Sequence, residues 1–418
     1  MDGRSLPELA GYICPLRIYD RRKGDEPVLK FITTGIMSAL LACTGGAILL
    51  VKAAEMAGLS DHHLLSWFFS VYVIGGVLNT VLTLKYKIPF AGAHSITGIA
   101  FIGSIAAYYP LPVLTGGFIL SGLLMVIVGC TRIFGRALRF VPKPIIDALL
   151  AGLLFSYIWG MIPSSFELPL CGLLAAAGYW IIPRFAKFLP PVIWSLMMGA
   201  IGLLIQNQLP WRDVTAKEFQ LPSLVMPEFT AVGFISIAIP LSLLIMSNDL
   251  AVALASLKSH QYDPPVNRVM AASGAATMFA GILGGHAANI GGMMTALCSS
   301  PEAGTPPKRI GAALVSNGLV ILFGLFAWKM LGWIQILPAP FISIMTGVPL
   351  LGLFINAVKS VARELKYILP SFITFIIAAL HLNLFGLSAP LWALLAGVMI
   401  LYLRRKFANR KGGLQDEV

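Results

Sequence analysis

The sequence predicts an all-α polytopic membrane protein with fourteen transmembrane segments, arranged as two inverted repeats of seven. Three observations predict this class: the composition, the order of apolar runs and basic loops, and two matched breaks in those runs. Of the 418 residues, 57% are hydrophobic and 11% are charged, and the mean hydropathy is +0.84. Soluble domains are about 45–50% apolar and about 25% charged, so this composition indicates a chain embedded in lipid.

The apolar runs give the expected segments. An α-helix needs about 20 apolar residues to cross a hydrocarbon core of roughly 30 Å. The third and tenth expected segments lack an uninterrupted apolar run of that length. The fourteen segments are expected at 29–51, 63–84, 91–109, 111–134, 142–162, 168–187, 189–207, 228–256, 264–286, 287–299, 307–333, 338–360, 366–384 and 386–405.

The basic residues predict the orientation. Residues 1–28 are polar and basic without a cleavable signal pattern, so we expect them in the cytoplasm. All but four of the 30 lysines and arginines then fall on the cytoplasmic side, as the positive-inside rule requires. The net charge of +12 therefore reflects topology, and no nucleic-acid partner is expected. The four exceptions are Lys52, Arg212, Lys217 and Lys329.

This orientation divides the chain. We expect cytoplasmic tails at 1–28 and 406–418, seven-span repeats at 29–207 and 228–405, and an extracytoplasmic linker at 208–227. The expected location is the inner or plasma membrane, with both termini in the cytoplasm. Because each repeat has an odd number of segments, the second repeat is inverted relative to the first.

A glycine-rich break interrupts the third segment of each half. Residues 91–101 read AGAHSITGIAF, and residues 284–297 read GGHAANIGGMMTAL. In transporters built from inverted repeats, such breaks form half-helices that meet at a substrate site near the midplane. We expect half-helices starting at Ser95 and near Ala288, with N-termini that attract an anion. The alternative is that these glycines only let helices pack closely.

Asp249 is the acidic residue placed deepest in these segments, in the stretch LLIMSNDLAVAL. Intramembrane acids are costly and usually functional, and burial favours the neutral form of a carboxyl group. Asp249 is therefore the first candidate for proton coupling, although it could instead bond the backbone of a neighbouring broken helix. His94 and His286 are further candidates for proton coupling, with a structural role in irregular backbone as the alternative.

The expected substrate contacts come from the two breaks and from the first and eighth segments. Thr44 belongs to a Thr-Gly-Gly step that either bends the first helix or offers a hydroxyl group to the ligand. No cofactor is expected, and no metal, because neither histidine of the breaks has an acidic or cysteine partner at ligand spacing. The expected contacts are Thr44, Ser95, Ile96, Thr97, Gly98, Asn248, Asp249, Ala288, Asn289 and Gly291.

Several stretches resemble the benzoate membrane transporter family. They include TGGAILLVKAAEMAGLS, LKYKIPF and AHSITGIAF in the first half, and SNDLAVALASLKSHQYDPP and GGHAANIGGMMTALCSSPEAGTPPKRIGAAL in the second. That family is similar in fold to the nucleobase-ascorbate transporters. The resemblance implies short strands leading into half-helices three and ten. It also implies a core domain of spans 1–4 and 8–11 that moves against a gate domain of spans 5–7 and 12–14.

The resemblance implies a function, which is symport of benzoate with protons. The expected partners are thus a small aromatic anion, a proton and the lipid bilayer, with no catalysed reaction; a homodimer stays open. The chain departs from the family at Asn248-Asp249-Leu250-Ala251-Val252, where the family has a Gln-Asn-x-Pro-Gly type sequence. An acid in span eight is also a feature of the nucleobase carriers. Symport of a nucleobase such as uracil or xanthine is therefore an alternative, as is an anion channel or exchanger on the same fold.

Overall fold

The computed structural model describes residues 29–133, 142–186, 189, 191–208, 218, 220–335, 337–380, 384 and 389–412. The expected N-terminal tail, the end of the expected C-terminal tail and half of the expected linker lie outside these residues. Helices make up most of the described chain, and no strand is formed within it.

The first half contains ten α-helices in the described residues. Two of its spans are continuous helices that contain a π-helical turn, labelled η1 and η2. The elements are α1 (Leu29–Leu41), η1 (Ala42–Gly46), α2 (Ala47–Met56), α3 (Asp61–Phe69), η2 (Ser70–Ile74), α4 (Gly75–Tyr86), α5 (Ile96–Ile105), the 3-10 turn η3 (Ala106–Tyr108), α6 (Leu111–Thr131), α8 (Lys143–Glu167), α9 (Pro169–Trp180), α10 (Ile182–Phe185) and α11 (Pro191–Ile205).

The second half begins with one long span that carries two π-helical turns, η4 and η5. Its described elements are α12 (Ala231–Gly233), η4 (Phe234–Ala238), α13 (Ile239–Leu244), η5 (Ile245–Leu250), α14 (Ala251–Ser259), α15 (Val266–Ile282), α16 (Gly292–Ser299), the 3-10 turn η6 (Pro301–Ala303), α17 (Pro306–Leu325), α18 (Ala327–Gln335), α19 (Ala339–Ala362), the 3-10 turn η7 (Leu365–Tyr367), α20 (Ile368–Ala379) and α21 (Ala389–Gly412).

Seven helical segments of the described chain are long and apolar enough to cross a membrane. They are Lys30–Met56, Asp61–Tyr86, Leu111–Thr131, Lys143–Glu167, Ala231–Ser259, Pro306–Leu325 and Ala339–Ala362. Five further apolar helices are shorter, at 10–17 residues, and α15 and α16 fall in the ninth and tenth expected segments. The chain is thus a helical membrane protein, while the count of fourteen crossings stays a prediction.

The π-helical turns coincide with polar steps inside apolar spans. Thr44 lies in η1, and the Thr44 hydroxyl donates to the Leu40 carbonyl at 2.7 Å. Asp249 lies in η5, within the long eighth span. A π-turn releases backbone groups locally without ending the helix, and such turns are frequent at functional sites.

The third and tenth expected segments are short helices preceded by extended backbone. Helix α16 has only 8 residues, a length of about 12 Å, which is less than half of a bilayer core. It begins at Gly292 and not near Ala288, because the Ala288 backbone is bonded to Thr277 of α15. Helix α5 begins at Ile96, directly after Ser95 as expected.

The expected short strands before these helices are not formed in the described residues. Residues 88–95 and 285–291 contain no helix or strand, and the two segments share only two backbone hydrogen bonds. Side chains occupy carbonyl groups that a neighbouring strand would otherwise use. The Phe90 carbonyl accepts from Thr83 and Asn317, and the Asn289 carbonyl accepts from Asn79.

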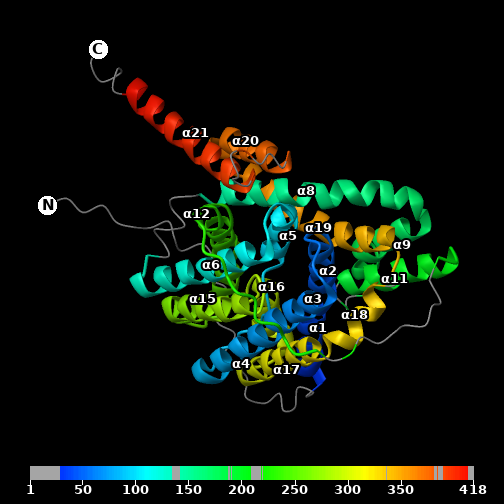
Figure 1. Ribbon diagram of the computed structural model, residues 1–418. Helices are drawn as coiled ribbons and strands as arrows, with labels where there is room; N and C mark the ends of the chain where they lie inside the picture. The colour runs from blue at the N-terminus through cyan, green and yellow to red at the C-terminus, as the bar shows by residue number, and fades with distance from the viewer. Residues whose placement is uncertain are drawn as a thin grey trace.

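The helices pack in two groups. In one group α6 lies beside α15 and α1 beside α17 (Figure 1), α14 contacts α16, and α2 contacts α5. In the other group α8 contacts α19, α20 and α21, and α9 contacts α11. Small residues bring α6 and α15 together, because a Cβ atom on Gly122 would lie 2.6 Å from the Gly274 carbonyl oxygen. We refer to these sets as the α6–α15 group and the α8–α19 group.

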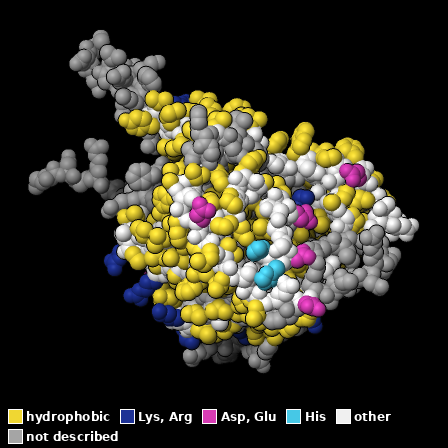
Figure 2. Space-filling model, viewed as in Figure 1, with side chains coloured by type: hydrophobic (Ala, Val, Ile, Leu, Met, Phe, Trp, Pro, Cys, Tyr) yellow, Lys and Arg dark blue, Asp and Glu magenta, His cyan; other side chains and the backbone are white. Residues whose placement is uncertain are grey.

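The surface of the molecule is largely apolar. Hydrophobic side chains cover most of the face in Figure 2, and few charged groups lie among them. Large apolar side chains on the outer helices are well exposed; Trp159, Leu173 and Phe372 are 63%, 68% and 60% exposed. Contiguous apolar surface of this extent is typical of contact with lipid.

Candidate functional site

The two extended segments pair with each other at the starts of α5 and α16. The Asn289 amide donates to the Ala93 carbonyl at 3.1 Å, and the Gly291 amide donates to the Ala91 carbonyl at 3.0 Å. The Thr295 hydroxyl closes the pair from α16, because it donates to the Ala91 carbonyl at 2.8 Å. Residues about 200 positions apart are thereby held together, as the matched breaks in the sequence predict.

Polar side chains from neighbouring spans support this pairing. Asn79 of α4 donates to the Asn289 carbonyl at 3.0 Å, and Asn317 of α17 donates to the Phe90 carbonyl at 3.0 Å. Both asparagines are fully buried. The sequence analysis missed them, although an uncharged amide within an apolar span is itself a signal, since a buried polar group requires a partner.

The starts of both short helices lie at this pairing. Ser95 caps α5, because the Ser95 hydroxyl accepts from the Gly98 amide at 2.9 Å. The Thr97 hydroxyl lies 3.1 Å from the Ser95 hydroxyl. Helix α16 starts after Gly291, which provides no side-chain cap. The first turn of a helix carries backbone N–H groups without partners inside the helix, so both starts favour negative charge.

Asp249 and Asn289 form a buried pair next to these helix starts. The Asn289 side-chain amide donates to the Asp249 carboxylate at 3.2 Å, and the Ser95 side chain also interacts with that carboxylate. Asp249 is 8% exposed, and Asn289 is fully buried. Two further polar atoms, Asn289 Oδ1 and Asn248 Nδ2, are buried without a hydrogen-bond partner among the described residues. Buried polar atoms without partners are costly, and a ligand would satisfy them.

The hydrogen bonds of His286 assign its tautomer. Its Nδ1 accepts from the Trp67 indole N–H at 3.0 Å, so its Nε2 carries the proton and donates to the Ser95 carbonyl at 3.0 Å. Both ring nitrogens are therefore in use. The imidazole ties the first break to the second, and it could gain a proton only by losing the bond from Trp67.

His94 has a different set of contacts. The Tyr72 hydroxyl donates to the Ala42 carbonyl at 2.8 Å, so its oxygen accepts from His94 Nε2 at 3.2 Å. His94 Nδ1 is then an acceptor, and it is buried without a partner in the described part of the chain. The His94 and His286 rings lie edge to face, with centroids 5.3 Å apart.

Most of the expected site residues lie at or beside the two helix starts. Ala288 and Thr44 are the exceptions, because their contacts are made elsewhere. Ile96 is the first residue of α5, and Gly98 lies in its first turn. Ala288 packs against Ala276 and Ala280, and its backbone is bonded to Thr277. The Thr44 hydroxyl is bonded within its own helix. In the described residues, no group of three histidine, cysteine or acidic side chains is arranged to hold a metal.

Comparison with known proteins identifies the family of this chain. The family model described as benzoate membrane transport protein matches residues 27–403. The chain belongs to this family. The benzoate membrane transport protein of Acinetobacter baylyi (strain ATCC 33305 / BD413 / ADP1) is 25% identical over 376 residues, which cover 89% of this chain and 94% of the relative. The resemblance seen in the sequence motifs is thus confirmed.

Two other proteins are similar to this benzoate transport family member, one in sequence and one in fold. The inner membrane protein YdcO of Escherichia coli (strain K12) is 27% identical over 385 residues, which cover 91% of this chain and 97% of the relative. The transmembrane domain of the cyanobacterial bicarbonate transporter BicA has a similar fold. Its TM-score is 0.60 at 15% sequence identity, and the match covers 89% of this chain and 97% of that domain.

Proposed function

We propose that this family member is a secondary active transporter that carries a small aromatic carboxylate, such as benzoate, together with a proton. The observation that carries the proposal is the Asp249–Asn289 pair beside the starts of α5 and α16. The helix starts supply positive partial charge for a carboxylate. Asn289 supplies polar side-chain atoms at the same place, and membership of the benzoate transport family supports the class of substrate.

The same pair provides a physical reason for proton coupling. A substrate carboxylate bound at the helix starts would lie near the Asp249 carboxylate, and two negative charges in a buried site repel each other strongly. Carboxylates that share one site therefore hold a proton between them. Binding of the substrate anion and of a proton would thus favour each other, which is the condition for symport.

Among the three candidates for proton coupling, the contacts favour Asp249. Both ring nitrogens of His286 are already bonded, so we assign this residue a structural role at the junction of the two breaks. His94 keeps one ring nitrogen without a partner, which makes it the second candidate.

A nucleobase is the second candidate substrate. The unpartnered Asn289 Oδ1 is an acceptor, which suits an N–H group of a heterocycle, and Asn248, the neighbour of Asp249 in the chain, carries an unpartnered donor at Nδ2 that suits a C=O group. An anion channel or exchanger is the third candidate, since two helix starts also suit a simple anion and a bicarbonate transporter shares the fold.

We also propose the topology expected from the sequence. Both termini are cytoplasmic, the 208–227 linker is extracytoplasmic, and the seven-span repeats at 29–207 and 228–405 are inverted. The α6–α15 group corresponds to the core domain and the α8–α19 group to the gate domain. This division is supported by the packing, because most close helix contacts lie within each group.

The test is uptake of radiolabelled benzoate by the purified protein in liposomes with an imposed pH gradient. We expect accumulation that an uncoupler abolishes and that uracil, xanthine and bicarbonate do not compete away. Accumulation of a nucleobase but not of benzoate would favour the second candidate. Benzoate movement that never exceeds equilibrium and ignores the pH gradient would favour a channel or exchanger.

A further inference from the structure

A cavity separate from the Asp249–Asn289 pair lies where the two helix groups meet. Its volume is about 170 Å³, and its lining comes from α2 and α5 on one side and from α8 and α19 on the other. None of the expected site residues lines it. The lining residues are Lys52, Met56, Ser104, Ser156, Tyr157, Gly160, Ser343 and Thr346.

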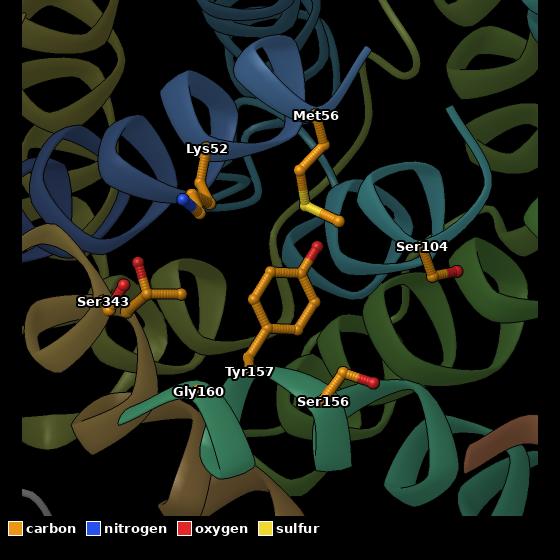
Figure 3. Close-up of a pocket in the computed structure, with 8 residues that line it drawn as sticks. Lys52, Met56, Ser104, Ser156, Tyr157, Gly160 and Ser343 are labelled. Carbon is orange, nitrogen blue, oxygen red and sulfur yellow. The ribbon is translucent and has the colours of Figure 1, made fainter. Parts of the chain in front are cut away.

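The size of this cavity suits one aromatic ring with a small substituent. An apolar cavity of about 150 Å³ is large enough to bind benzene. Here the Tyr157 ring and the Met56 side chain provide apolar wall, and Figure 3 shows Tyr157 beside the space between Lys52 and Ser343. The lining thus combines apolar surface for a ring with the Lys52 and Ser343 side chains, which lie on the same side of Tyr157 in Figure 3.

The cavity lining includes a cationic side chain, that of Lys52. Lys52 lines the cavity and its side chain is 30% exposed. Its one ion-pair contact in the described residues is with Glu55, at 3.5 Å, which is a long contact. An ammonium group has three donors, so Lys52 can also bind a carboxylate in the cavity.

Thr346 provides a second, independent indication of a ligand. The residue lines the same cavity and is only 4% exposed, and its hydroxyl oxygen, which is covered by its neighbours in this structure, has no hydrogen-bond partner among the described residues. A buried hydroxyl without a partner is energetically costly, and a ligand that bonds it removes that cost. By contrast, the Ser104 hydroxyl is bonded to the Phe101 carbonyl at 2.6 Å within its own helix.

Tyr157 connects this cavity to the helix that starts at the candidate site. The Tyr157 hydroxyl donates to the Ala100 carbonyl of α5 at 3.2 Å, so α8 and α5 are bonded across the boundary between the two helix groups. The cavity lies toward the C-terminal end of α5, and Lys52 lies near the end of the first span. Under the proposed topology both ends face the outside of the cell.

We propose that this cavity is a second, outward-facing binding site for the aromatic carboxylate. The Lys52 ammonium and the Thr346 hydroxyl bind the carboxylate, and Tyr157 and Met56 contact the ring. The site captures substrate from the outer side before it reaches the Asp249–Asn289 pair. This inference rests on the proposed function, since it takes the same class of ligand.

The experiment compares the KM for benzoate from each side of the membrane. Uptake by intact cells gives the KM on the outer side, and uptake by inside-out vesicles gives the KM on the cytoplasmic side. We expect Lys52→Gln and Thr346→Val to raise the outer KM, on the order of tenfold for Lys52→Gln, and to leave the cytoplasmic KM unchanged.

Two control variants match these changes. Lys329→Gln removes a positive charge that the proposed topology also places outside, but Lys329 lies over the Trp328 ring and not at the cavity. Thr346→Ser keeps the hydroxyl group. Both should leave the outer KM within about twofold of wild type, since neither removes a group that holds the carboxylate.

The outcomes separate the two proposals. An unchanged outer KM in both Lys52→Gln and Thr346→Val would overturn the outer site and leave the proposed function standing. A rise of equal size on both sides would also overturn the outer site, because it indicates a general structural effect. If the wild-type protein carries no benzoate at all, the proposed function and the outer site are both refuted.

Discussion

Gly92→Ala tests the pairing of the two breaks at its tightest point. A Cβ atom on residue 92 would lie 2.2 Å from the Gly291 nitrogen and 2.6 Å from the Asn289 carbonyl oxygen. Both neighbours are backbone atoms, so no side-chain rotation can relieve the contact. The extended segments would have to separate by roughly 1 Å to restore ordinary van der Waals distances.

The cost has two parts. Overpacking a well-packed interior costs about 1–3 kcal/mol. The separation also weakens the Asn289–Ala93 and Gly291–Ala91 hydrogen bonds, each worth about 0.5–1.5 kcal/mol. We therefore expect Gly92→Ala to lose about 2–5 kcal/mol of stability and to weaken benzoate binding at least tenfold, because the helix starts no longer align.

The assay is thermal unfolding in detergent together with benzoate affinity by calorimetry. Gly318→Ala in α17 is the matched control, since a Cβ atom there meets nothing within 4 Å. That variant should keep its affinity and match or exceed the wild-type stability, because alanine favours a helix by about 1 kcal/mol over glycine. If Gly92→Ala has the wild-type melting temperature and affinity, the segments are not packed as described.

Three further predictions concern the site and the topology. Gly291→Leu should reduce transport at least tenfold while most of the protein still folds, because the added side chain meets Gly92 and Met294 at the start of α16; normal transport would place the site elsewhere. Trp67→Phe leaves His286 Nδ1 without its donor and should cost about 1–3 kcal/mol in thermal unfolding, whereas unchanged stability would show that this bond contributes little. In Lys217→Cys, the new thiol should react with an impermeant reagent added outside the cell; reaction only from the cytoplasm would contradict the inverted topology.

The sequence predicts the location of the candidate site because glycines and polar residues are costly in an apolar run. The stretches around His94 and His286 stand out for that reason, and so does Asp249. The structure places all three in buried positions around Ser95. These features depend on local composition, which a single sequence reveals.

Long-range contacts decide what the sequence could not predict. The start of α16 moves to Gly292 because backbone groups of the preceding residues bond Ala91, Ala93 and Thr277, which lie elsewhere in the chain. The tautomer of His286 depends on Trp67, 219 positions away. Neither contact leaves a periodic or compositional signal.

The outer cavity illustrates the same limit. Lys52 looks in the sequence like a charge at the end of a span, and Thr346 looks like an ordinary small residue of an apolar helix. Only the packing of α2 against α19 brings them to one cavity. Single-sequence reasoning finds polar residues that interrupt apolar runs, but it does not find those that converge from different helices.

The most direct test of the central claim is Asp249→Asn, measured for both binding and proton-driven uptake. Asparagine keeps the size and hydrogen bonding of the side chain but removes its titration. In the wild-type protein, benzoate affinity should weaken as the pH rises, because an ionised Asp249 repels the carboxylate. In Asp249→Asn, binding and exchange should persist without that pH dependence, and accumulation driven by a pH gradient in liposomes should fail. Normal pH-driven accumulation by Asp249→Asn would contradict the account and make His94 the candidate for coupling.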